Sequence, residues 1–449
     1  MTEGTIEVKR EVPIRHEVDV FVAGGGPAGA VAAVAAARQG RRVYLAEGHT
    51  CLGGMGTAGL VPAFMRFGDG ENMCAAGVGE EILRRLITAG GAGPGRTDPN
   101  IASIGSVGID AEVLKRVYDD LLTDAGVDFT FQTTLIGVEK DADDHVSHAI
   151  CAAKSGVFAV AAKMFVDGTG DGDLAAWAGA PFEKGDENGD MMPGTLCSLW
   201  ADVDWATINR AALGTGNARL EDAFKDGVFT HPDKHLPGMW RVGENVGGGN
   251  IGHTFGVDNT DERSITEALI WGRKLVLEYE RYYREYLKGF KEMKLMATGS
   301  LLGIRETRRV MGDYLLNLDD FKSRAVFDDE IGRYSYPVDI HPTRPDDESY
   351  DKFMEEWTNL RYKKGESYGI PYRVLTPTGL SNVLVAGRCV STDRSMQGTV
   401  RTMPGCYITG QAAGVAAAIA IEKDTDTRGF EVSELQGRLK DIGAFLPNY

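Results

Sequence analysis

The chain has 449 residues, 43% hydrophobic and 25% charged, which is enough for two or three globular domains with sizeable cores. Its formal net charge of −17 argues against nucleic acid or an anionic membrane surface as the main partner, because both bind basic surfaces. Residues 1–17 lack the apolar stretch of a secretory signal, and no apolar run is long enough to predict a membrane span. The six cysteines show no CxxC pair and no metal-ligand spacing. We therefore expect a cytoplasmic protein with no disulfide framework and no metal site.

The N-terminal region has the pattern of a strand, a glycine-rich turn, a helix and a second strand. Residues 18–23 are apolar and β-branched, residues 30–39 are almost all alanine and valine, and residues 42–46 are again apolar. The turn before the helix carries a GxGxxG pattern, whose residues are Gly24, Gly25, Gly26, Pro27, Ala28 and Gly29. Glu47 closes the second strand about 20 residues further on, at the spacing of a ribose-binding acid. This unit predicts a dinucleotide-binding site at the start of the helix.

Each glycine of the pattern has a separate expected role. Gly24 permits the tight turn, Gly26 lets a pyrophosphate approach the backbone, and Gly29 lets the helix pack against the strand. Glu47 can accept hydrogen bonds from both ribose hydroxyls and would repel a 2′-phosphate, which disfavours NADP. The alternative is a glycine-rich turn that only packs a helix on a sheet.

Later glycine turns favour FAD over NAD. A second glycine-rich loop follows Glu47 directly, and its candidate cofactor residues are Gly48, Cys51, Gly54 and Met55. Two further apolar strands, residues 163–167 and 382–386, also run into glycine turns. The candidate residues after these strands are Gly170, Asp171, Gly387 and Arg388. Such loops suit a cofactor that extends past its adenosine into the protein.

These elements, in this order, resemble a bacterial FAD-dependent oxidoreductase family of the glutathione-reductase type. The motifs that carry the resemblance are Gly-Ile-Arg-Glu-Thr-Arg-Arg at 303–309, Tyr-Gly-Ile-Pro-Tyr-Arg at 368–373, Ala-Gly-Arg-Cys at 386–389, Arg-Thr-Met-Pro-Gly-Cys at 401–406 and Gly-Gln-Ala-Ala-Gly at 410–414. The resemblance covers about residues 18–420. It implies the fold, bound FAD and oxidoreductase activity, and it does not identify a substrate.

One position departs from the pattern of the wider fold. In many relatives the last strand ends in Gly-Asp, and the aspartate holds the ribityl chain, whereas here Arg388 follows Gly387. Arg388 or backbone groups must therefore replace that contact. The helix predicted after Pro404 is rich in glycine and alanine, so it can pack very closely on a neighbour. Met403 and Gly405 at its start are candidate flavin contacts, where the helix dipole would stabilise negative charge on the reduced ring; the alternative is a helix that only packs.

The chain as a whole predicts an α/β fold: a Rossmann-like FAD-binding domain, with a parallel sheet and a β-meander, and an inserted α+β substrate domain. Residues 114–126 have the pattern of an amphipathic helix. The runs that predict the meander are residues 129–139, 146–153 and 157–165. The expected boundaries are 15–180 and 376–449 for a discontinuous FAD-binding domain, with 296–320 as an optional addition, and 181–295 and 321–375 for the substrate domain.

A long helix is expected within the substrate domain. Residues 264–267 form a capping box, which predicts that the helix begins there and ends near residue 293. Tyrosines at helical spacing form one stripe on it, namely Tyr279, Tyr282, Tyr283 and Tyr286. Such a stripe is typical of a core or a subunit interface, which leaves a homo-oligomer open, and less often of a substrate wall.

Flavin chemistry needs groups that position the substrate and exchange a proton. His253, in a glycine-rich stretch, is a candidate base for an alcohol, and Tyr372 is a candidate proton donor; the alternatives are a structural histidine and a packing tyrosine. Arginines can hold a carboxylate through paired hydrogen bonds or can form ion pairs with acids such as Glu306. The candidate arginines are Arg305, Arg308, Arg373 and Arg401.

Covalent attachment of FAD is the less favoured alternative. His49 and Cys51 lie just past the ribose acid, and the His-Thr pair is loosely similar to a motif at which some flavoproteins attach the cofactor. The spacing to the following glycines is shorter than in that motif. We therefore expect non-covalent FAD and interpret Cys51 as a small buried residue.

Three functions fit these patterns. The first is an FAD enzyme that oxidises a C–H bond of a small polar substrate, such as an alcohol, a sugar, an amine or an acid. The second is a fumarate-reductase-like enzyme that adds hydride to an activated C=C bond. The third is an FAD-carrying electron-relay subunit, which the lack of iron–sulfur spacing disfavours. No second GxGxxG lies between a strand and a helix, so a separate NAD(P)H domain is not expected and the electron acceptor is unknown.

Overall fold

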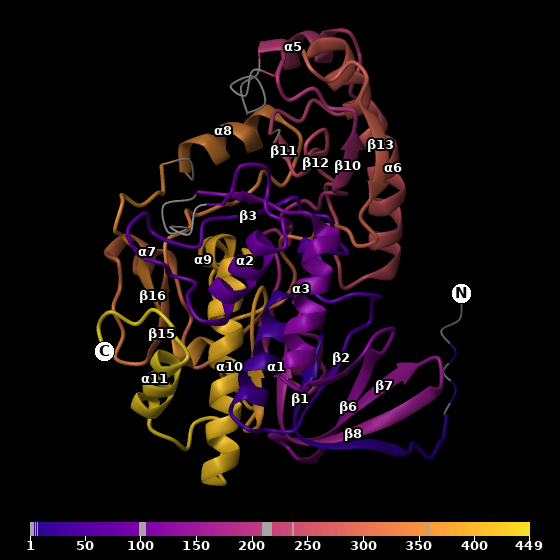
Figure 1. Ribbon diagram of the computed structural model, residues 1–449. Helices are drawn as coiled ribbons and strands as arrows, with labels where there is room; N and C mark the ends of the chain where they lie inside the picture. Colours follow the sequence, from indigo (N-terminus) through magenta and orange to yellow (C-terminus); the bar gives the residue numbers. More distant parts are fainter. Residues whose placement is uncertain are drawn as a thin grey trace.

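A seven-stranded sheet organises the larger of two lobes (Figure 1). The computed structural model describes residues 4, 6, 8–97, 105–208, 218–235, 238–356 and 359–449. The strands of this sheet are β1 (Ile14–Ala23), β2 (Val43–Ala46), β5 (Asp128–Thr130), β6 (Thr134–Ala142), β7 (His145–Ala153), β8 (Gly156–Asp167) and β17 (Val383–Val385). Their order is β5-β2-β1-β8-β7-β6, with β17 also paired to β8.

The pairing directions divide this sheet into two parts. Strands β5, β2, β1, β8 and β17 run parallel, whereas β6 and β7 are antiparallel to their neighbours. On one edge of β8, β7 pairs with residues 156–161 and β17 pairs with residues 165–167. The predicted parallel sheet and β-meander are therefore both present, and the long strand β8 belongs to each of them.

Two apolar helices, α1 (Pro27–Arg38) and α10 (Met403–Lys423), lie side by side through the middle of this lobe (Figure 1). A Cβ at Gly410 would lie 2.3 Å from the carbonyl oxygen of Ala28, and one at Gly414 would lie 2.2 Å from that of Ala32. Only glycine allows the two backbones to approach so closely. By length and composition, α10 alone among the helices of the described residues could cross a membrane, but 94% of its most apolar stretch is buried in the protein.

The other helices and short strands of the larger lobe surround this layer. The helices are α2 (Val78–Thr88), α3 (Ala111–Asp124), α4 (Asp173–Trp177), α7 (Leu318–Ser323), α9 (Arg394–Val400) and α11 (Val432–Asp441). The short strands form three pairs, β3 (Ala63–Phe64) with β4 (Val107–Gly108), β9 (Phe182–Glu183) with β14 (Arg309–Val310), and β15 (Glu330–Tyr334) with β16 (Tyr368–Pro371). Short 3-10 helices cover Gly54–Gly56 and Tyr372–Val374. Helix α3 confirms the amphipathic helix predicted at 114–126; it begins three residues earlier, because the side chain of Asp110 caps it.

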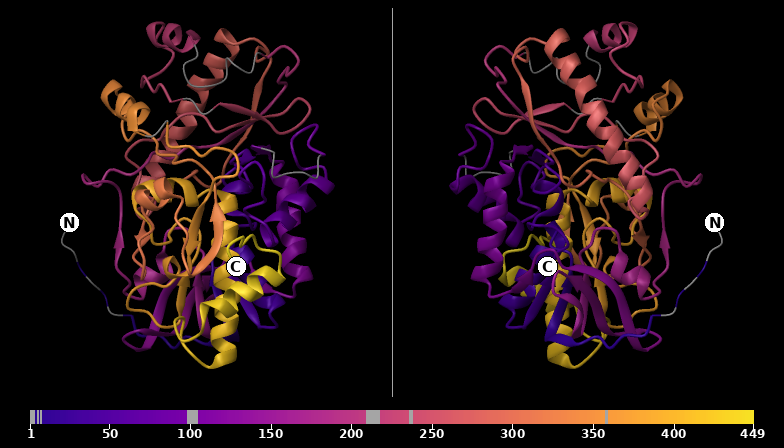
Figure 2. Two further views of the ribbon diagram at one scale, coloured as in Figure 1. Left: turned by 90° about the vertical axis from the view of Figure 1, so that its left-hand side faces the viewer. Right: turned by 90° about the vertical axis from the view of Figure 1, so that its right-hand side faces the viewer.

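The smaller lobe stands above the sheet in both side views (Figure 2). Its four-stranded antiparallel sheet has the order β11-β12-β10-β13, and α5 (Ala218–Lys225), α6 (Glu262–Tyr286) and α8 (Asp347–Glu356) surround it. The strands are β10 (Ser198–Ala201), β11 (Met239–Arg241), β12 (Gly247–Gly249) and β13 (Lys294–Thr298).

Helix α6 corrects one prediction and confirms another. It begins at Glu262 rather than at residue 264, because the side chain of Asp261 accepts hydrogen bonds from the backbone N–H groups of residues 263 and 264, and it ends at Tyr286. The capping box predicted at 264–267 therefore does not start the helix. Three tyrosines of the predicted stripe are buried in the core of the smaller lobe, which confirms that the stripe belongs to a core. These are Tyr279, Tyr282 and Tyr283.

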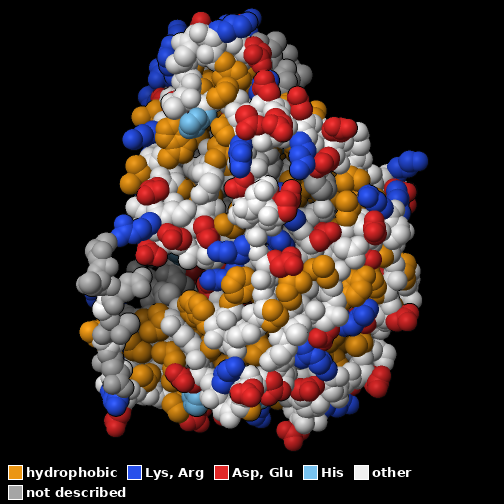
Figure 3. Space-filling model, turned by 180° about the vertical axis from the view of Figure 1, so that it is seen from behind, with side chains coloured by type: hydrophobic (Ala, Val, Ile, Leu, Met, Phe, Trp, Pro, Cys, Tyr) orange, Lys and Arg blue, Asp and Glu red, His pale blue; other side chains and the backbone are white. Residues whose placement is uncertain are grey.

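The division between the lobes differs from the predicted domain boundaries. Strand β13 is part of the four-stranded sheet, so residues 294–298 belong to the smaller lobe. Strands β15 and β16 instead pack in the same core as the seven-stranded sheet. Most of the segment 321–375 therefore lies with the larger lobe, although its sequence suggested the substrate domain. Figure 3 shows acidic and basic side chains intermixed on the rear face, with no broad basic patch on the described part of that face.

Candidate active site

The glycine turns at the carboxyl ends of β1, β8 and β17 border one elongated cavity, which we call the sheet-edge cavity. It has about 1170 Å³ of space between protein atoms, part of it open to solvent. Thirteen of the sixteen predicted cofactor residues line it: Gly24, Gly26, Pro27, Ala28, Glu47, Gly48, Gly54, Met55, Gly170, Asp171, Gly387, Arg388 and Met403. Segments far apart in the sequence thus meet at one edge of the sheet, as ligand sites in open α/β sheets do.

The turn after β1 has the geometry that its glycines predict. Gly24 has a φ of +84°, and a Cβ there would lie 2.9 Å from the carbonyl oxygen of Gly168. A Cβ at Gly29 would lie 1.9 Å from the carbonyl oxygen of Gly24, so Gly29 serves the packing of α1 and does not line the cavity. No side chain caps the start of α1 at Gly26. Its first backbone N–H groups are therefore available to a phosphate.

Glu47 is held in a fixed orientation at the far end of the cavity. It is 5% exposed, and its two carboxylate oxygens each accept a backbone N–H at 2.7 Å, from Gly25 and from His49. Each oxygen has a further lone pair, so the carboxylate can still accept ribose hydroxyls.

Arg388 lies beside an acid that comes from a different strand. Its Nη2 donates to Asp171 Oδ1 at 2.6 Å, and Thr307 Oγ1 donates to the same oxygen at 2.8 Å. Asn259 Nδ2 donates to Asp171 Oδ2 at 2.9 Å. The loop after β8 thus places a carboxylate beside Arg388, and both residues line the sheet-edge cavity.

A second cavity joins the first and lies between the two lobes; we call it the inter-lobe cavity. It has about 1050 Å³ of space between protein atoms, part of it open to solvent. Four residues line both cavities, namely Met55, Arg388, Arg401 and Met403. Helix α10 begins at this junction, and no side chain caps its first turn. A ligand in the inter-lobe cavity therefore lies next to the end of the sheet-edge cavity that α10 borders.

Two of the four arginines predicted as candidates to hold a carboxylate line the inter-lobe cavity. Arg305 is 6% exposed; its Nη1 donates to the carbonyl oxygen of Pro193 at 2.8 Å and to Thr195 Oγ1 at 2.9 Å, and its Nη2 donates to Asn250 Oδ1 at 3.3 Å. Burial lowers the pKa of Arg305 to about 10, so the group stays protonated at neutral pH. Arg401 Nη2 donates to the carbonyl oxygen and to Oδ2 of Asp339, at 3.0 and 3.1 Å.

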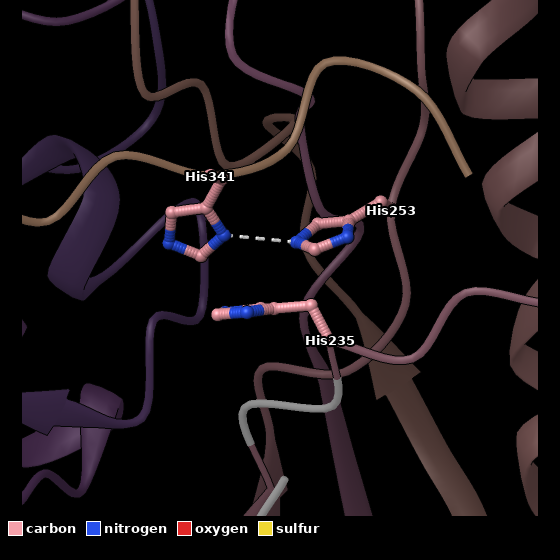
Figure 4. Close-up of side chains that lie close together, drawn as sticks. All are labelled: His235, His253 and His341. Atoms are coloured by element: carbon pink, nitrogen blue, oxygen red, sulfur yellow. Dashed lines mark hydrogen bonds between the residues drawn. The ribbon is translucent and has the colours of Figure 1, made fainter. Parts of the chain in front are cut away.

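Three histidines form a cluster at one side of the inter-lobe cavity, which we call the histidine wall (Figure 4). His235 and His341 line the cavity, and His253 lies behind them, with its Nε2 3.0 Å from His341 Nδ1. Burial lowers the pKa of His235 to about 4 and that of His341 well below its ordinary value, so both rings are neutral at neutral pH. The predicted base His253 is thus separated from the cavity by His341. His235 and His341 were missed because neither lies in a recognisable motif.

The structure moves five predicted residues away from the cavities. The hydroxyl of Tyr372 donates to the carbonyl oxygen of Thr427, and Arg373 forms an ion pair with Asp329 at 2.9 Å near the surface, so we no longer assign a catalytic role to either. Three predicted cofactor residues do not line the sheet-edge cavity and serve packing instead; these are Gly29, Cys51 and Gly405. Arg308 forms an ion pair with Asp173 at 2.6 Å, in agreement with the alternative that the candidate arginines pair with acids.

The sheet-edge cavity fits an FAD molecule. The buried carboxylate of Glu47 lines it, as do glycines such as Gly24 and Gly387, where a Cβ would lie 2.9 Å from protein atoms. The uncapped starts of α1 and α10 can supply N–H groups to a diphosphate and to a flavin ring.

This chain is similar to several known proteins. A geranylgeranyl bacteriochlorophyll reductase-like protein from Thermoplasma acidophilum is 14% identical, with a TM-score of 0.50 over 95% of this chain and 84% of that chain. A p-nitrophenol 4-monooxygenase from Pseudomonas putida is 12% identical, with a TM-score of 0.44 over 95% of this chain and 84% of that chain. At such identities the first similarity shows a shared fold only. A search of curated protein sequences found no match. The model of the family described as FAD dependent oxidoreductase matches residues 19–439, so the chain belongs to this family and is an enzyme that uses FAD.

Proposed function

We propose that the protein transfers a hydride between FAD in the sheet-edge cavity and a small, negatively charged organic substrate in the inter-lobe cavity. The observation that carries this proposal is the buried guanidinium of Arg305. Its hydrogen-bond acceptors are three neutral oxygens, and none of the ion pairs formed by the described residues includes it. A buried charge without a counter-ion is costly, and a substrate carboxylate would remove that cost.

The other cations of the cavity are already paired. Arg388 is paired with Asp171 and Arg401 with Asp339, whereas Asp339 and Asp233 act on Arg305 only at longer range, so no carboxylate of the described residues contacts its guanidinium. An anionic substrate is therefore attracted to this cavity in spite of the acidic surface. FAD, when bound, accepts or donates a hydride at N5. The chain itself holds the substrate against the junction of the cavities and places the neutral rings of His235 and His341 beside its oxygen atoms.

The experiment is anaerobic mixing of the oxidised enzyme with 2-hydroxy acids, amino acids, amines and sugars. We expect bleaching of the flavin absorbance by a carboxylate-bearing compound. The variant Arg305→Met should raise KM for that compound far more than it lowers flavin content, because a charge-assisted hydrogen bond contributes about 1.5–3 kcal/mol. Arg373→Met is the matched control, since Arg373 is paired at the surface outside both cavities.

Other outcomes would decide between the remaining functions. Bleaching by neutral sugars or amines, with KM unchanged in Arg305→Met, would refute an anionic substrate. Rapid reoxidation of chemically reduced enzyme by an unsaturated acid would establish the reverse direction, addition of hydride to an activated C=C bond. Failure of both, together with a co-purifying protein, would favour an electron-relay subunit.

We also propose the finer properties that the resemblance implies. Strand order and the β-meander support a glutathione-reductase type of FAD domain. Cys51 lies outside the cavity lining, which supports non-covalent FAD, whereas His49 lines the cavity and stays a candidate for attachment. Acid precipitation decides between the two, because covalent flavin would stay in the pellet. Six free cysteines support a cytoplasmic location. The partners would be the substrate and an electron acceptor of unknown class.

A further inference from the structure

Three histidines bring their ring nitrogens close together beside the inter-lobe cavity. His235, His253 and His341 come from three separate loops, and one nitrogen of each lies within 4.8 Å of those of the other two. Figure 4 shows His253 and His341 facing one another, with the ring of His235 beneath the gap between them. The ring centroids are 4.5 to 5.4 Å apart.

Carboxylates stand behind two of these rings, on the side away from the point of convergence. Asp233 Oδ2 lies 2.8 Å from His253 Nδ1, and Asp339 Oδ1 lies 3.5 Å from His341 Nε2. Asp233 Oδ1 also accepts the backbone N–H of His235 at 3.0 Å, so one carboxylate orients two of the histidine segments. A histidine that binds a metal through one nitrogen commonly has its other nitrogen held by a carboxylate in this way.

The protein alone satisfies this cluster poorly. His235 is only 9% exposed, and its Nδ1 is buried without a hydrogen-bond partner among the described residues. The two facing nitrogens of His253 and His341, 3.0 Å apart, can share only one proton. Buried polar atoms without partners are rare and call for a specific explanation. A cation at the point of convergence would give all three rings a partner.

The distances are close to those of a metal site. Zinc lies about 2.0–2.1 Å from imidazole nitrogen, so two such ligands on a tetrahedral ion are about 3.3 Å apart. The facing pair is already at 3.0 Å, and all three ligand nitrogens lie within 4.8 Å of one another, so His235 would have to move closer when a metal binds. Imidazole ligands suit zinc, iron, copper and nickel, whereas calcium and magnesium prefer oxygen.

We propose that His235, His253 and His341 bind one divalent transition-metal ion whose remaining position opens into the inter-lobe cavity. His235 and His341 both line that cavity, so a ligand in it can reach the ion. Three protein ligands with one open position are typical of catalytic rather than structural sites. The part of this inference that concerns substrate rests on the proposed function: the ion would hold an oxygen atom of the substrate whose carboxylate contacts Arg305.

Titration calorimetry of the untagged, flavin-loaded enzyme with Zn²⁺, after removal of metal by a chelator, tests the site. We expect one ion per chain. Asp233→Asn should weaken binding by about 10–100-fold, the effect usual for a residue behind a metal ligand. His235→Ala should weaken it further. His145→Ala is the matched control, because this exposed histidine pairs with Asp141 outside the site.

The result does not depend on the proposed reaction. Absence of Zn²⁺ binding by the wild-type enzyme would overturn the metal site, and so would equal affinity in wild type, Asp233→Asn and His235→Ala. Flavin absorbance and the melting temperature of each variant show whether it is folded. If Zn²⁺ binds but carboxylates never reduce the flavin, the metal site stands and the proposed function fails. If carboxylates reduce the flavin but Zn²⁺ does not bind, the proposed function stands and the metal site fails.

Discussion

The close packing of α1 on α10 can be tested with one methyl group. In Gly410→Ala the new Cβ would lie 2.3 Å from the carbonyl oxygen of Ala28, where ordinary contact begins at 3.4 Å, so the helices must separate by about 1 Å. The atoms in the way belong to backbone and cannot rotate aside. Overpacking costs up to about 3 kcal/mol, while replacing a helical glycine returns about 1 kcal/mol. We expect a net loss of about 2 kcal/mol in the free energy of unfolding.

Gly437→Ala is the control for this prediction. Gly437 lies on the exposed side of α11, and a Cβ there meets no atom within 4 Å. The same substitution should therefore stabilise the protein by about 1 kcal/mol. Thermal unfolding of the flavin-loaded variants by circular dichroism measures both effects, at roughly 1 °C per kcal/mol for a chain of this size. Melting temperatures that shift in the same direction, or a Gly410→Ala variant as stable as wild type, would refute the packing argument.

Three further predictions concern the sheet-edge cavity and the cysteines. Glu47→Gln turns an amide towards one of two backbone N–H donors, so FAD should dissociate roughly 10–100-fold more readily, as measured by flavin fluorescence on dilution; unchanged retention would remove the ribose role. Arg388→Met leaves the carboxylate of Asp171 without its cation, so the free energy of unfolding measured in urea should fall by about 3 kcal/mol. An unchanged free energy of unfolding would show that the pair is well solvated. All six thiols are buried and burial raises the pKa of each, so a thiol reagent at about pH 8 should label none in the native state and six in denaturant; rapid labelling of the native enzyme would contradict the burial.

The cofactor cavity could be predicted because its signals are local. Each glycine turn directly follows an apolar strand, and parallel strands bring their carboxyl ends to one edge, so Gly24, Gly170 and Gly387 had to meet. Strand β8 was also recognisable from its long apolar run. These inferences needed only the order of elements and the direction of the strands.

The histidine wall could not be predicted, because its members meet only through tertiary structure. His253 is 18 residues from His235 and 88 from His341, and all three lie in loops without a regular pattern. The resemblance also failed to show which way side chains of a motif point. Tyr372 and Arg373 follow β16 and face the segments of Thr427 and Asp329, away from the cavities.

Arg401 belongs to the lining of both cavities and is tied through Asp339 to His341. We therefore expect binding at the two places to be coupled through this side chain. Such coupling is reciprocal: if a substrate analogue raises the affinity for FAD by some factor, then FAD raises the affinity for the analogue by the same factor. The affinity for flavin measured with and without the analogue, and the affinity for the analogue measured with and without flavin, would then give the same coupling constant.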